Sequence, residues 1–232
     1  MLENAYINGE YLEKNPGWHI EESPWKALQI ERMLKKHNLT PQTICEVGCG
    51  VGEVLKELQK GVQDDCILWG YDISPQAISF CTPKANERLH FKLADIRQEQ
   101  DAFFDLLLVL DVFEHLEDCF GFLRALKSKG QNKIFHIPLD ISLQSVLRPN
   151  GLLYTRDAYG HIHYYTKETA IRTLQDAGYE VIDYFYTRRA LEIPPENLKR
   201  KILLLPRKLL FNIHQDLAAR ILGGFSLLVL AR

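Results

Sequence analysis

The feature that most constrains the fold is an alternation of short apolar runs with helical segments from residue 43 onward. Strands and helices that alternate in this way favour a parallel sheet covered by helices on both faces. The run at 103–110 is almost entirely apolar, as a strand buried on both faces should be. Seven strands are expected, the last antiparallel beside the sixth, at Thr43–Val47, Cys66–Tyr71, Leu89–Leu93, Phe103–Leu110, Lys133–Ile137, Tyr179–Tyr186 and Phe225–Ala231. The sequence therefore predicts a single α/β domain of the doubly wound, mostly parallel type.

Turn and capping residues place helices between these strands. Ser74 followed by Pro75 is a strong helix start, because serine caps the first turn and proline fits the first helical position. Another helix is expected at 166–177, closed by Gly178. Right-handed crossovers bring the carboxyl ends of parallel strands to one edge of the sheet, where ligands bind. We therefore expect functional residues just after strands one to five.

A glycine-rich loop, Gly48-Cys49-Gly50-Val51-Gly52, follows the first strand directly. Glycines let the backbone turn sharply and approach a ligand, and the free N–H groups of the next helix then face that ligand. A tight turn without a ligand is the alternative. The dinucleotide fingerprint GxGxxG would need glycine at position 53, where this chain has Glu53. Glu46, two residues before the loop, would repel a pyrophosphate and suit a ligand with a cationic amine.

Acidic residues also follow the second, third and fourth strands. Asp72 lies 20 residues after Gly52, where a carboxylate can accept hydrogen bonds from a ribose diol. Asp95 and Asp111 come after the next two strands. Each alone could be a turn or capping aspartate, but acids at four successive strand ends are hard to assign to chance.

Together these motifs resemble those of class I S-adenosylmethionine-dependent methyltransferases, in their small-molecule branch. The segment 46–52 resembles the first motif of that family, 70–74 carries its ribose-binding acid, and 94–96 is similar to the motif that flanks the adenine. The segment 111–116 resembles the stretch after strand four, and 166–179 resembles the last helix and the entry to strand six. The resemblance covers about residues 40–187 and the closing strand.

The resemblance implies a Rossmann-like methyltransferase fold with S-adenosylmethionine as cofactor and S-adenosylhomocysteine as product. It assigns cofactor binding to Glu46, Gly48, Cys49, Gly50, Gly52, Asp72, Ile73, Asp95, Ile96 and Asp111.

Histidines are the candidates for the acceptor side of the site. His115 is expected on the first turn after strand four, and the resemblance places His161 near the substrate, so these two are the predicted catalytic residues. His136, at the end of strand five, is a further option, and each of these could instead be a packed histidine. His161 and His163 point to opposite sides if their segment is extended, so at most one of them faces a substrate. No metal site is expected, because this pair lacks further ligands.

Two segments outside the alternating pattern are expected to shape the acceptor pocket. About residues 1–40 form a helical cap, in which Pro24-Trp25 resembles nodulation-type N-methyltransferases of chito-oligosaccharides. About residues 188–222 form an insert between strands six and seven. There, 199–211 mixes basic residues with an apolar stripe, and Pro206 should break or start a helix. Packing of this stripe as a lid or dimer element is favoured over a peripheral membrane contact.

Charge and cysteine content exclude several classes of protein. Residues 188–232 hold nine Lys/Arg and three Asp/Glu (net +6), which leaves −8 for the rest of a −2 chain, so nucleic-acid binding is not expected. Five scattered cysteines without a CxxC pair predict reduced packing residues. No membrane span is expected, because the apolar run Ile221–Ala231 has 11 residues against the ~20 that a bilayer requires. No targeting peptide is expected, because the first residues are acidic and lack an apolar segment. A cytoplasmic monomer or homodimer is predicted.

These observations favour an enzyme that transfers a methyl group from S-adenosylmethionine to a small molecule with an oxygen or nitrogen nucleophile, including a glycan or a lipid-linked one. In-line displacement from an activated donor needs mainly proximity and alignment. One alternative is a non-catalytic module that binds the cofactor and partners another enzyme. An NAD-dependent oxidoreductase is a second alternative, which Glu46 and the GxGxG spacing disfavour.

Overall fold

The computed structural model describes residues 17–18, 20–193 and 198–232, so residues 1–16 and 19 of the predicted N-terminal cap lie outside it. Seven strands form one sheet in the order β3-β2-β1-β4-β5-β7-β6. The first five strands run parallel, and β7 is antiparallel to both β5 and β6. The strands are β1 (Thr43–Val47), β2 (Ile67–Asp72), β3 (Leu89–Leu93), β4 (Phe104–Leu110), β5 (Gly130–Pro138), β6 (Val181–Thr187) and β7 (Ser226–Ala231). The predicted α/β class, the seven strands and the antiparallel seventh strand are confirmed.

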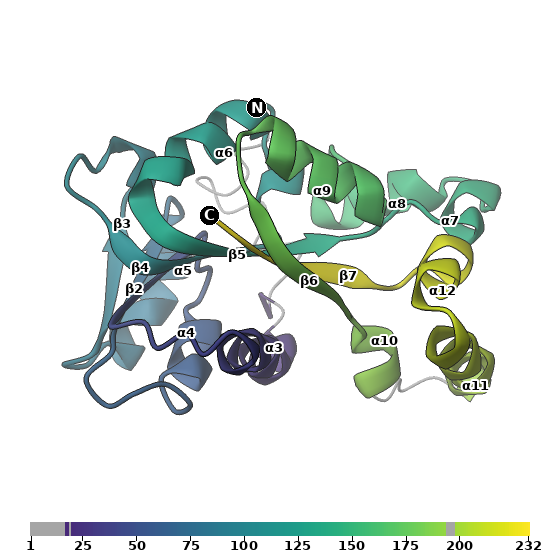
Figure 1. Cartoon of the computed structure of the whole chain (residues 1–232), viewed down its shortest axis with the longest axis horizontal. Coiled ribbons are helices and arrows are strands. Elements are labelled where there is room, and N and C mark those ends of the chain that lie inside the picture. Colours follow the sequence, from purple (N-terminus) through teal and green to yellow (C-terminus); the bar gives the residue numbers. More distant parts are fainter. Residues whose placement is uncertain (1–16, 19, 194–197) are drawn as a thin grey trace.

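Helices cover both faces of the sheet (Figure 1). On one face α6 (Cys119–Leu126) and α9 (Lys167–Asp176) bury a cluster of apolar side chains against the central strands. On the other face α3 (Ser23–Lys36), α4 (Glu53–Leu58) and α5 (Pro75–Cys81) bury a second cluster. All five cysteines are buried and unpaired, as the sequence predicts.

The capping residues act as expected. The Ser74 hydroxyl accepts a hydrogen bond from the Ala77 N–H, with Pro75 in the first turn of α5. Thr166 caps α9 through the Thr169 N–H. Strand β5 begins three residues earlier than predicted, because Gly130 and Asn132 pair with β4 although neither is apolar. Two short helices, α7 (Leu143–Leu147) and α8 (Gly151–Tyr159), lie between β5 and α9, where the sequence analysis predicts none.

Three helices lie between β6 and β7: α10 (Arg189–Glu192), α11 (Leu198–Ile213) and α12 (Gln215–Leu222). The prediction that Pro206 breaks or starts a helix is wrong, since Pro206 lies inside α11. An internal proline costs a helix about 3 kcal/mol. Packing offsets this cost, because Phe211 is buried with Ala218, Ala219 and Phe225.

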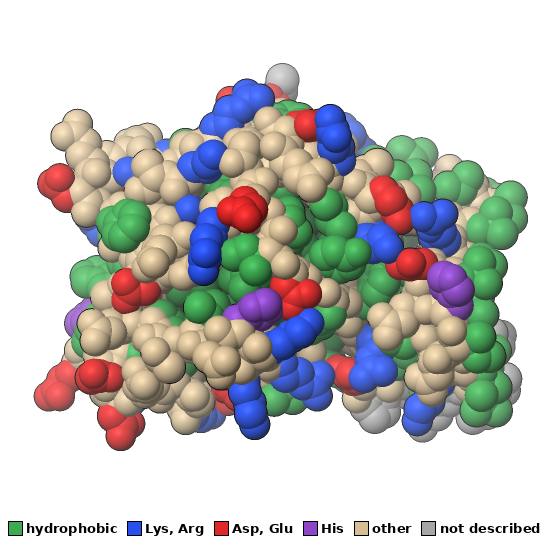
Figure 2. Space-filling model, in the orientation of Figure 1, with side chains coloured by type: hydrophobic (Ala, Val, Ile, Leu, Met, Phe, Trp, Pro, Cys, Tyr) green, Lys and Arg blue, Asp and Glu red, His purple; other side chains and the backbone are tan. Residues whose placement is uncertain are grey.

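The apolar residues of α11 divide between two faces. Phe211 faces the protein, whereas Leu205, Leu209 and Ile213 are exposed, the last to 80%. Figure 2 shows hydrophobic side chains along this edge of the molecule, near α7, α8 and α11. The outer face of the stripe is therefore not packed onto this chain, and its role as a lid or dimer element stays a prediction. The side chains of the predicted basic cluster at 199–201 lie outside the described residues. No helix in the described part of the chain is long and apolar enough to span a membrane.

Candidate functional site

A cavity of about 580 Å³ opens at the carboxyl edge of the sheet. Residues after β1 to β5 line it, together with residues of α3 and α10. Its volume is in the range of small-molecule and cofactor sites. Every predicted site residue except Gly52 lines this cavity, and so does His136.

The glycine loop depends on backbone conformations that suit glycine. Gly48, Gly50 and Gly52 have φ values of +70°, +53° and +73°. A Cβ on Gly48 would lie 3.0 Å from a Val112 methyl group, and one on Gly52 would lie 2.4 Å from the Phe91 ring. Gly52 caps α4 and packs against β3, which explains why it stays outside the cavity. The loop therefore combines an open cradle at Gly50 with a structural glycine at its end.

Asp72 holds the loop in place and still faces the cavity. Its Oδ2 accepts the Gly50 N–H at 2.8 Å, and its Oδ1 accepts the Ser74 N–H at 2.8 Å. Burial raises the pKa of this carboxyl group above its ordinary value, while these backbone hydrogen bonds lower it. A carboxylate offers about four lone-pair sites, so two remain for a diol in the cavity.

Glu46 is a buried acid with an unpaired oxygen. It is 3% exposed, and its Oε2 has no hydrogen-bond partner among the described residues. Burial raises its pKa to about 8, and the positive charge of Lys26 opposes that rise. An unpartnered buried carboxylate beside the loop is complementary to a cationic amine.

Asp111 forms charged contacts with both the sheet and α3. Its Oδ2 pairs with Lys26 Nζ at 2.7 Å, and its Oδ1 bonds to His136 Nδ1 at 2.7 Å. Despite burial, these two partners hold its pKa well below the ordinary range. His136 Nε2 is also engaged, with the Thr187 hydroxyl at 2.9 Å. Both ring nitrogens of His136 thus have partners in this chain, and Asp111 lines the cavity while both of its oxygens are bonded.

Asp95 and Ile96 form the wall of the cavity after β3. Asp95 accepts the Arg97 N–H at 2.9 Å and its guanidinium at 2.8 Å, which shapes the short turn Ile96–Gln98. Ile96 is buried and lines the cavity, so this turn offers an apolar surface to a planar ring.

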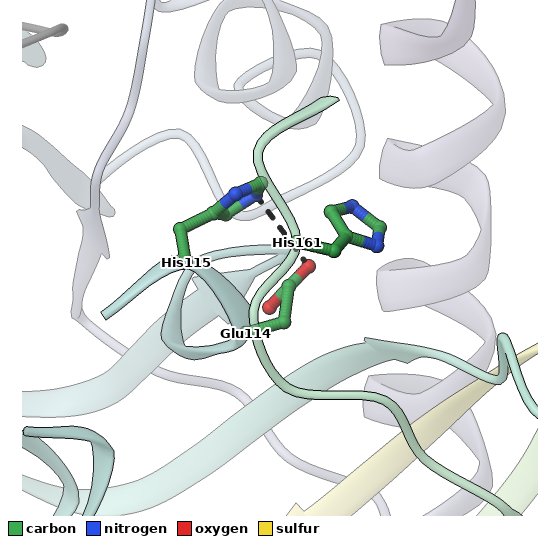
Figure 3. Close-up of side chains that lie close together, drawn as sticks. All are labelled: Glu114, His115 and His161. Carbon is green, nitrogen blue, oxygen red and sulfur yellow. Dashed lines mark ion pairs between the residues drawn. The ribbon is translucent and has the colours of Figure 1, made fainter. Parts of the chain in front are cut away.

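Glu114, His115 and His161 lie close together, and the two histidines line the cavity (Figure 3). His115 Nε2 lies 3.8 Å from Glu114 Oε1, and the His115 and His161 ring centroids are 4.9 Å apart. Burial and the neighbouring His161 lower the pKa of His115 to about 4. Burial raises the pKa of Glu114 well above its ordinary value.

His161 lines the cavity and His163 does not; His163 Nε2 bonds to the Leu116 carbonyl at 2.8 Å. The spacing of two residues therefore does separate these histidines. Glu114 was not predicted as a site residue, although it directly precedes His115 at the sheet edge where acids gather. That adjacency is the signal that could have found it.

Long-range contacts join α3 to α10 above the cavity. Trp25 Nε1 donates to Glu192 Oε2 at 2.6 Å, and Arg189 pairs with Glu22 at 2.5 Å. The edge of the Trp25 indole also meets the His136 ring, with 6.0 Å between centroids. Helices α3 and α10 thus form one connected wall of the cavity, which we call the roof.

Comparison with known proteins identifies the family. A family model described as a methyltransferase domain matches residues 18–184. The chain belongs to this family. No curated protein gives a significant match. The predicted methyltransferase class is therefore confirmed.

Solved structures with the same fold include three methyltransferases crystallised with S-adenosylhomocysteine. The plantazolicin methyltransferase BpumL is 19% identical, with a TM-score of 0.64 over 99% of this chain and 93% of that one. The magnesium protoporphyrin IX methyltransferase of Synechocystis is 17% identical, with a TM-score of 0.60 over 90% and 82%. The N-methyltransferase NodS of Bradyrhizobium japonicum is 17% identical, with a TM-score of 0.56 over 91% and 86%. At these identities the likeness establishes the fold.

Proposed function

We propose that this methyltransferase transfers a methyl group from S-adenosylmethionine to an oxygen or nitrogen atom of a small molecule. The observation that carries the proposal is the pairing, in one cavity, of a glycine loop tied to Asp72 with the buried Glu46, whose Oε2 has no partner among the described residues. Solved structures of this fold with bound S-adenosylhomocysteine support it.

The residues present fit this cofactor. Glu46 offers its free oxygen to the amino group, and Asp72 offers its remaining lone pairs to the ribose hydroxyls. Asp95 and Ile96 flank the base, and Gly48, Cys49, Gly50 and Ile73 bring backbone close to the ligand. Gly52 acts indirectly, by shaping the loop. We assign Asp111 to orientation of Lys26 and His136.

The chemistry follows from the donor, which supplies a methyl group on a positively charged sulfur. The chain has to align a nucleophile with that methyl group and exclude water, which can contribute ~7–11 kcal/mol. We propose that the roof of α3 and α10 encloses the acceptor and that His115 and His161 contact it. Those two side chains would position the nucleophile beside the methyl group.

The cavity extends beyond the cofactor residues to the histidine cluster, which supports an enzyme over a module that only binds the cofactor. A methyltransferase activator, Trm112, accompanies one solved neighbour of 14% identity, a putative methyltransferase of Haloferax volcanii. Glu46 beside the loop opposes a nicotinamide cofactor, whose pyrophosphate it would repel. We further propose a cytosolic location, in keeping with five free thiols.

The test is calorimetric titration of the purified chain with S-adenosylhomocysteine. Asp72→Ala should weaken binding ~10- to 150-fold, the effect of losing a hydrogen bond to a charged group. Asp101→Ala, at an exposed aspartate outside the cavity, should bind like the wild type. Binding of NADH with no binding of S-adenosylhomocysteine would overturn the proposal. If S-adenosylhomocysteine binds, transfer of labelled methyl groups to a metabolite pool would identify the acceptor.

A further inference from the structure

We propose that Glu114, His115 and His161 bind one divalent transition-metal ion, such as Zn²⁺, at the acceptor side of the cavity. The metal leaves a coordination position for a hydroxyl group of the acceptor. This inference deepens the proposed function, and only its statement about the acceptor depends on that function.

Geometry is the first argument for the metal. One ligand atom from each of the three residues lies within 4.8 Å of the others, and the Nε2–Oε1 pair of His115 and Glu114 is 3.8 Å apart. Ligands around tetrahedral zinc, each ~2.0–2.2 Å from the ion, are about 3.4 Å apart. Small rotations of these side chains would therefore bring the three ligand atoms to the spacing that a bound ion requires. Figure 3 shows the three side chains converging from two segments of the chain.

Backbone hydrogen bonds hold these two segments together. Glu114 and His115 lie on the turn Phe113–His115 after β4, whereas His161 follows α8. The N–H groups of Ile162 and His163 both donate to the Glu114 carbonyl, at 2.9 and 3.1 Å. The third ligand is thus fixed against the first two by the fold, as a preorganised site requires.

The carboxylate of Glu114 supplies the second argument. Its side chain is fully buried, and neither oxygen has a hydrogen-bond partner among the described residues. A buried carboxyl group without a partner costs free energy, whereas coordination of a cation compensates both oxygens. Zinc sites made of two histidines and one glutamate are a known catalytic ligand set.

The partner of His161 supplies the third argument. His161 Nδ1 bonds to Asp140 Oδ2 at 2.7 Å, and that contact leaves Nε2 as the ligand nitrogen. Histidines that bind metals generally donate their other N–H to a carboxylate or carbonyl in this way, which orients the ring and increases its basicity. Asp140 is therefore a positioning residue of the proposed site.

Three protein ligands leave at least one position open, which is typical of catalytic rather than structural sites. Because His115 and His161 line the cavity, that position faces the acceptor. A metal ion lowers the pKa of a bound hydroxyl group. The hydroxyl proton passes to water, the oxygen–methyl bond forms, and the methyl–sulfur bond breaks with its electron pair going to sulfur. A protonated amine has no lone pair for the metal, so the site selects hydroxyl acceptors over ammonium groups.

The experiment measures metal binding in the absence of cofactor and acceptor. The full chain is dialysed against a chelator and titrated with Zn²⁺, and separately with Mn²⁺ and Mg²⁺. One ion per chain should bind, Zn²⁺ most tightly. Glu114→Gln and His161→Gln should weaken Zn²⁺ binding at least ~100-fold, and Asp140→Asn by ~10- to 100-fold. His163→Gln, two residues from His161, is the matched control and should bind Zn²⁺ like the wild type.

Binding of S-adenosylhomocysteine and the melting temperature, measured without metal, show that each variant is folded. Failure of the wild-type chain to bind Zn²⁺ while it binds S-adenosylhomocysteine would overturn the metal site and leave the proposed function standing. Zinc binding that Glu114→Gln leaves unchanged, or that His163→Gln weakens equally, would also overturn it. If Zn²⁺ binds as expected but S-adenosylhomocysteine does not, the proposed function fails and the metal site stands.

Discussion

The two halves of the cavity are built from different kinds of contact. The donor half, formed by residues after β1, β2 and β3, is held mainly by backbone groups, as in the bonds from the Gly50 and Ser74 amides to Asp72. The acceptor half is formed by residues after β4 and β5 with α3, α10 and the segment 139–166. It combines backbone bonds, such as those to the Glu114 carbonyl, with side-chain contacts between distant segments. Its bond from Trp25 to Glu192 joins residues 167 positions apart.

This difference has a physical consequence. Backbone hydrogen bonds constrain the chain at every residue that takes part, so the donor half accepts few substitutions. Side-chain pairs can be exchanged one at a time, which lets the acceptor half change its ligand while the sheet edge stays the same. Loss of a donor-half glycine should therefore cost more than loss of an acceptor-half pair.

The largest effect is expected for Gly52→Ala. Both its φ of +73° and the 2.4 Å approach to Phe91 oppose a methyl group, so the free energy of unfolding should fall by about 2–4 kcal/mol. Gly50→Ala is the matched variant, because its nearest neighbour, Trp18, lies at 3.4 Å. It should lose about 1–2 kcal/mol of stability and more of its affinity for S-adenosylhomocysteine. Urea unfolding measures the stability of both variants, and calorimetry measures their affinity for S-adenosylhomocysteine. Equal losses of stability in the two variants would contradict the distinction between Gly50 in the binding loop and Gly52 as a structural glycine.

The same contrast explains what the sequence could predict. The bounds of β1 and β3 match the prediction in full, because β1 is a short, mostly apolar run that ends at a glycine and β3 alternates apolar and polar residues. The residues proposed for the donor half could be predicted to lie together because glycines and acids at fixed spacing are a local pattern. The donor half is easier to predict from the sequence than the acceptor half, because its contacts are formed by residues close together in the sequence.

Features that depend on distant contacts could not be predicted. Helix α11 continues through Pro206 because Phe211 packs with residues of α12 and Phe225. The short helices α7 and α8 carry no long apolar period. Glu114 and His161 meet only after the segment 160–163 returns to the turn after β4. The contacts of Asp111 with Lys26 and His136 also depend on the fold, and the sequence pattern does not show them.

A pH dependence should sharpen the description of the donor half. The pKa of Glu46 is about 8 in the ligand-free chain, and a bound cationic amine favours the ionised form. Binding of S-adenosylhomocysteine should therefore release a proton below pH 8, and affinity should increase from pH 6 to 7.5 by no more than ~tenfold per pH unit. Calorimetry in two buffers of different ionisation enthalpy detects this proton.

Glu46→Gln is the control for this dependence, because it cannot ionise. Its affinity should be lower and should lose the increase with pH. The stability of the ligand-free chain should change in the opposite sense. Since the folded pKa lies above the unfolded value of ~4.3, the contribution of Glu46 to stability is lost as the pH rises toward 8. An affinity that falls with pH, or an unchanged slope in Glu46→Gln, would refute the assignment of Glu46 to the amine.

The smallest effect is expected in the acceptor half, for Trp25→Phe. Phenylalanine keeps the aromatic packing on His136 and removes the indole N–H that reaches Glu192, while Arg188 still holds Glu192 through two bonds. Removing one of several partners of a carboxylate should cost about 1 kcal/mol, because water can reach part of this site. The amides of 191–193, which close the turns of α10, should then exchange with deuterium about fivefold faster.

Trp69→Phe is the matched control for this loosening, since Trp69 packs between Tyr71 and His90 in the sheet, away from the roof. It should leave exchange in α10 unchanged. Affinity for S-adenosylhomocysteine should stay at the wild-type value in Trp25→Phe, because α10 offers no group to the donor half. A fall in that affinity as large as the gain in exchange would mean that the roof and the cradle form one cooperative unit, and the two halves would then have to be treated as one site.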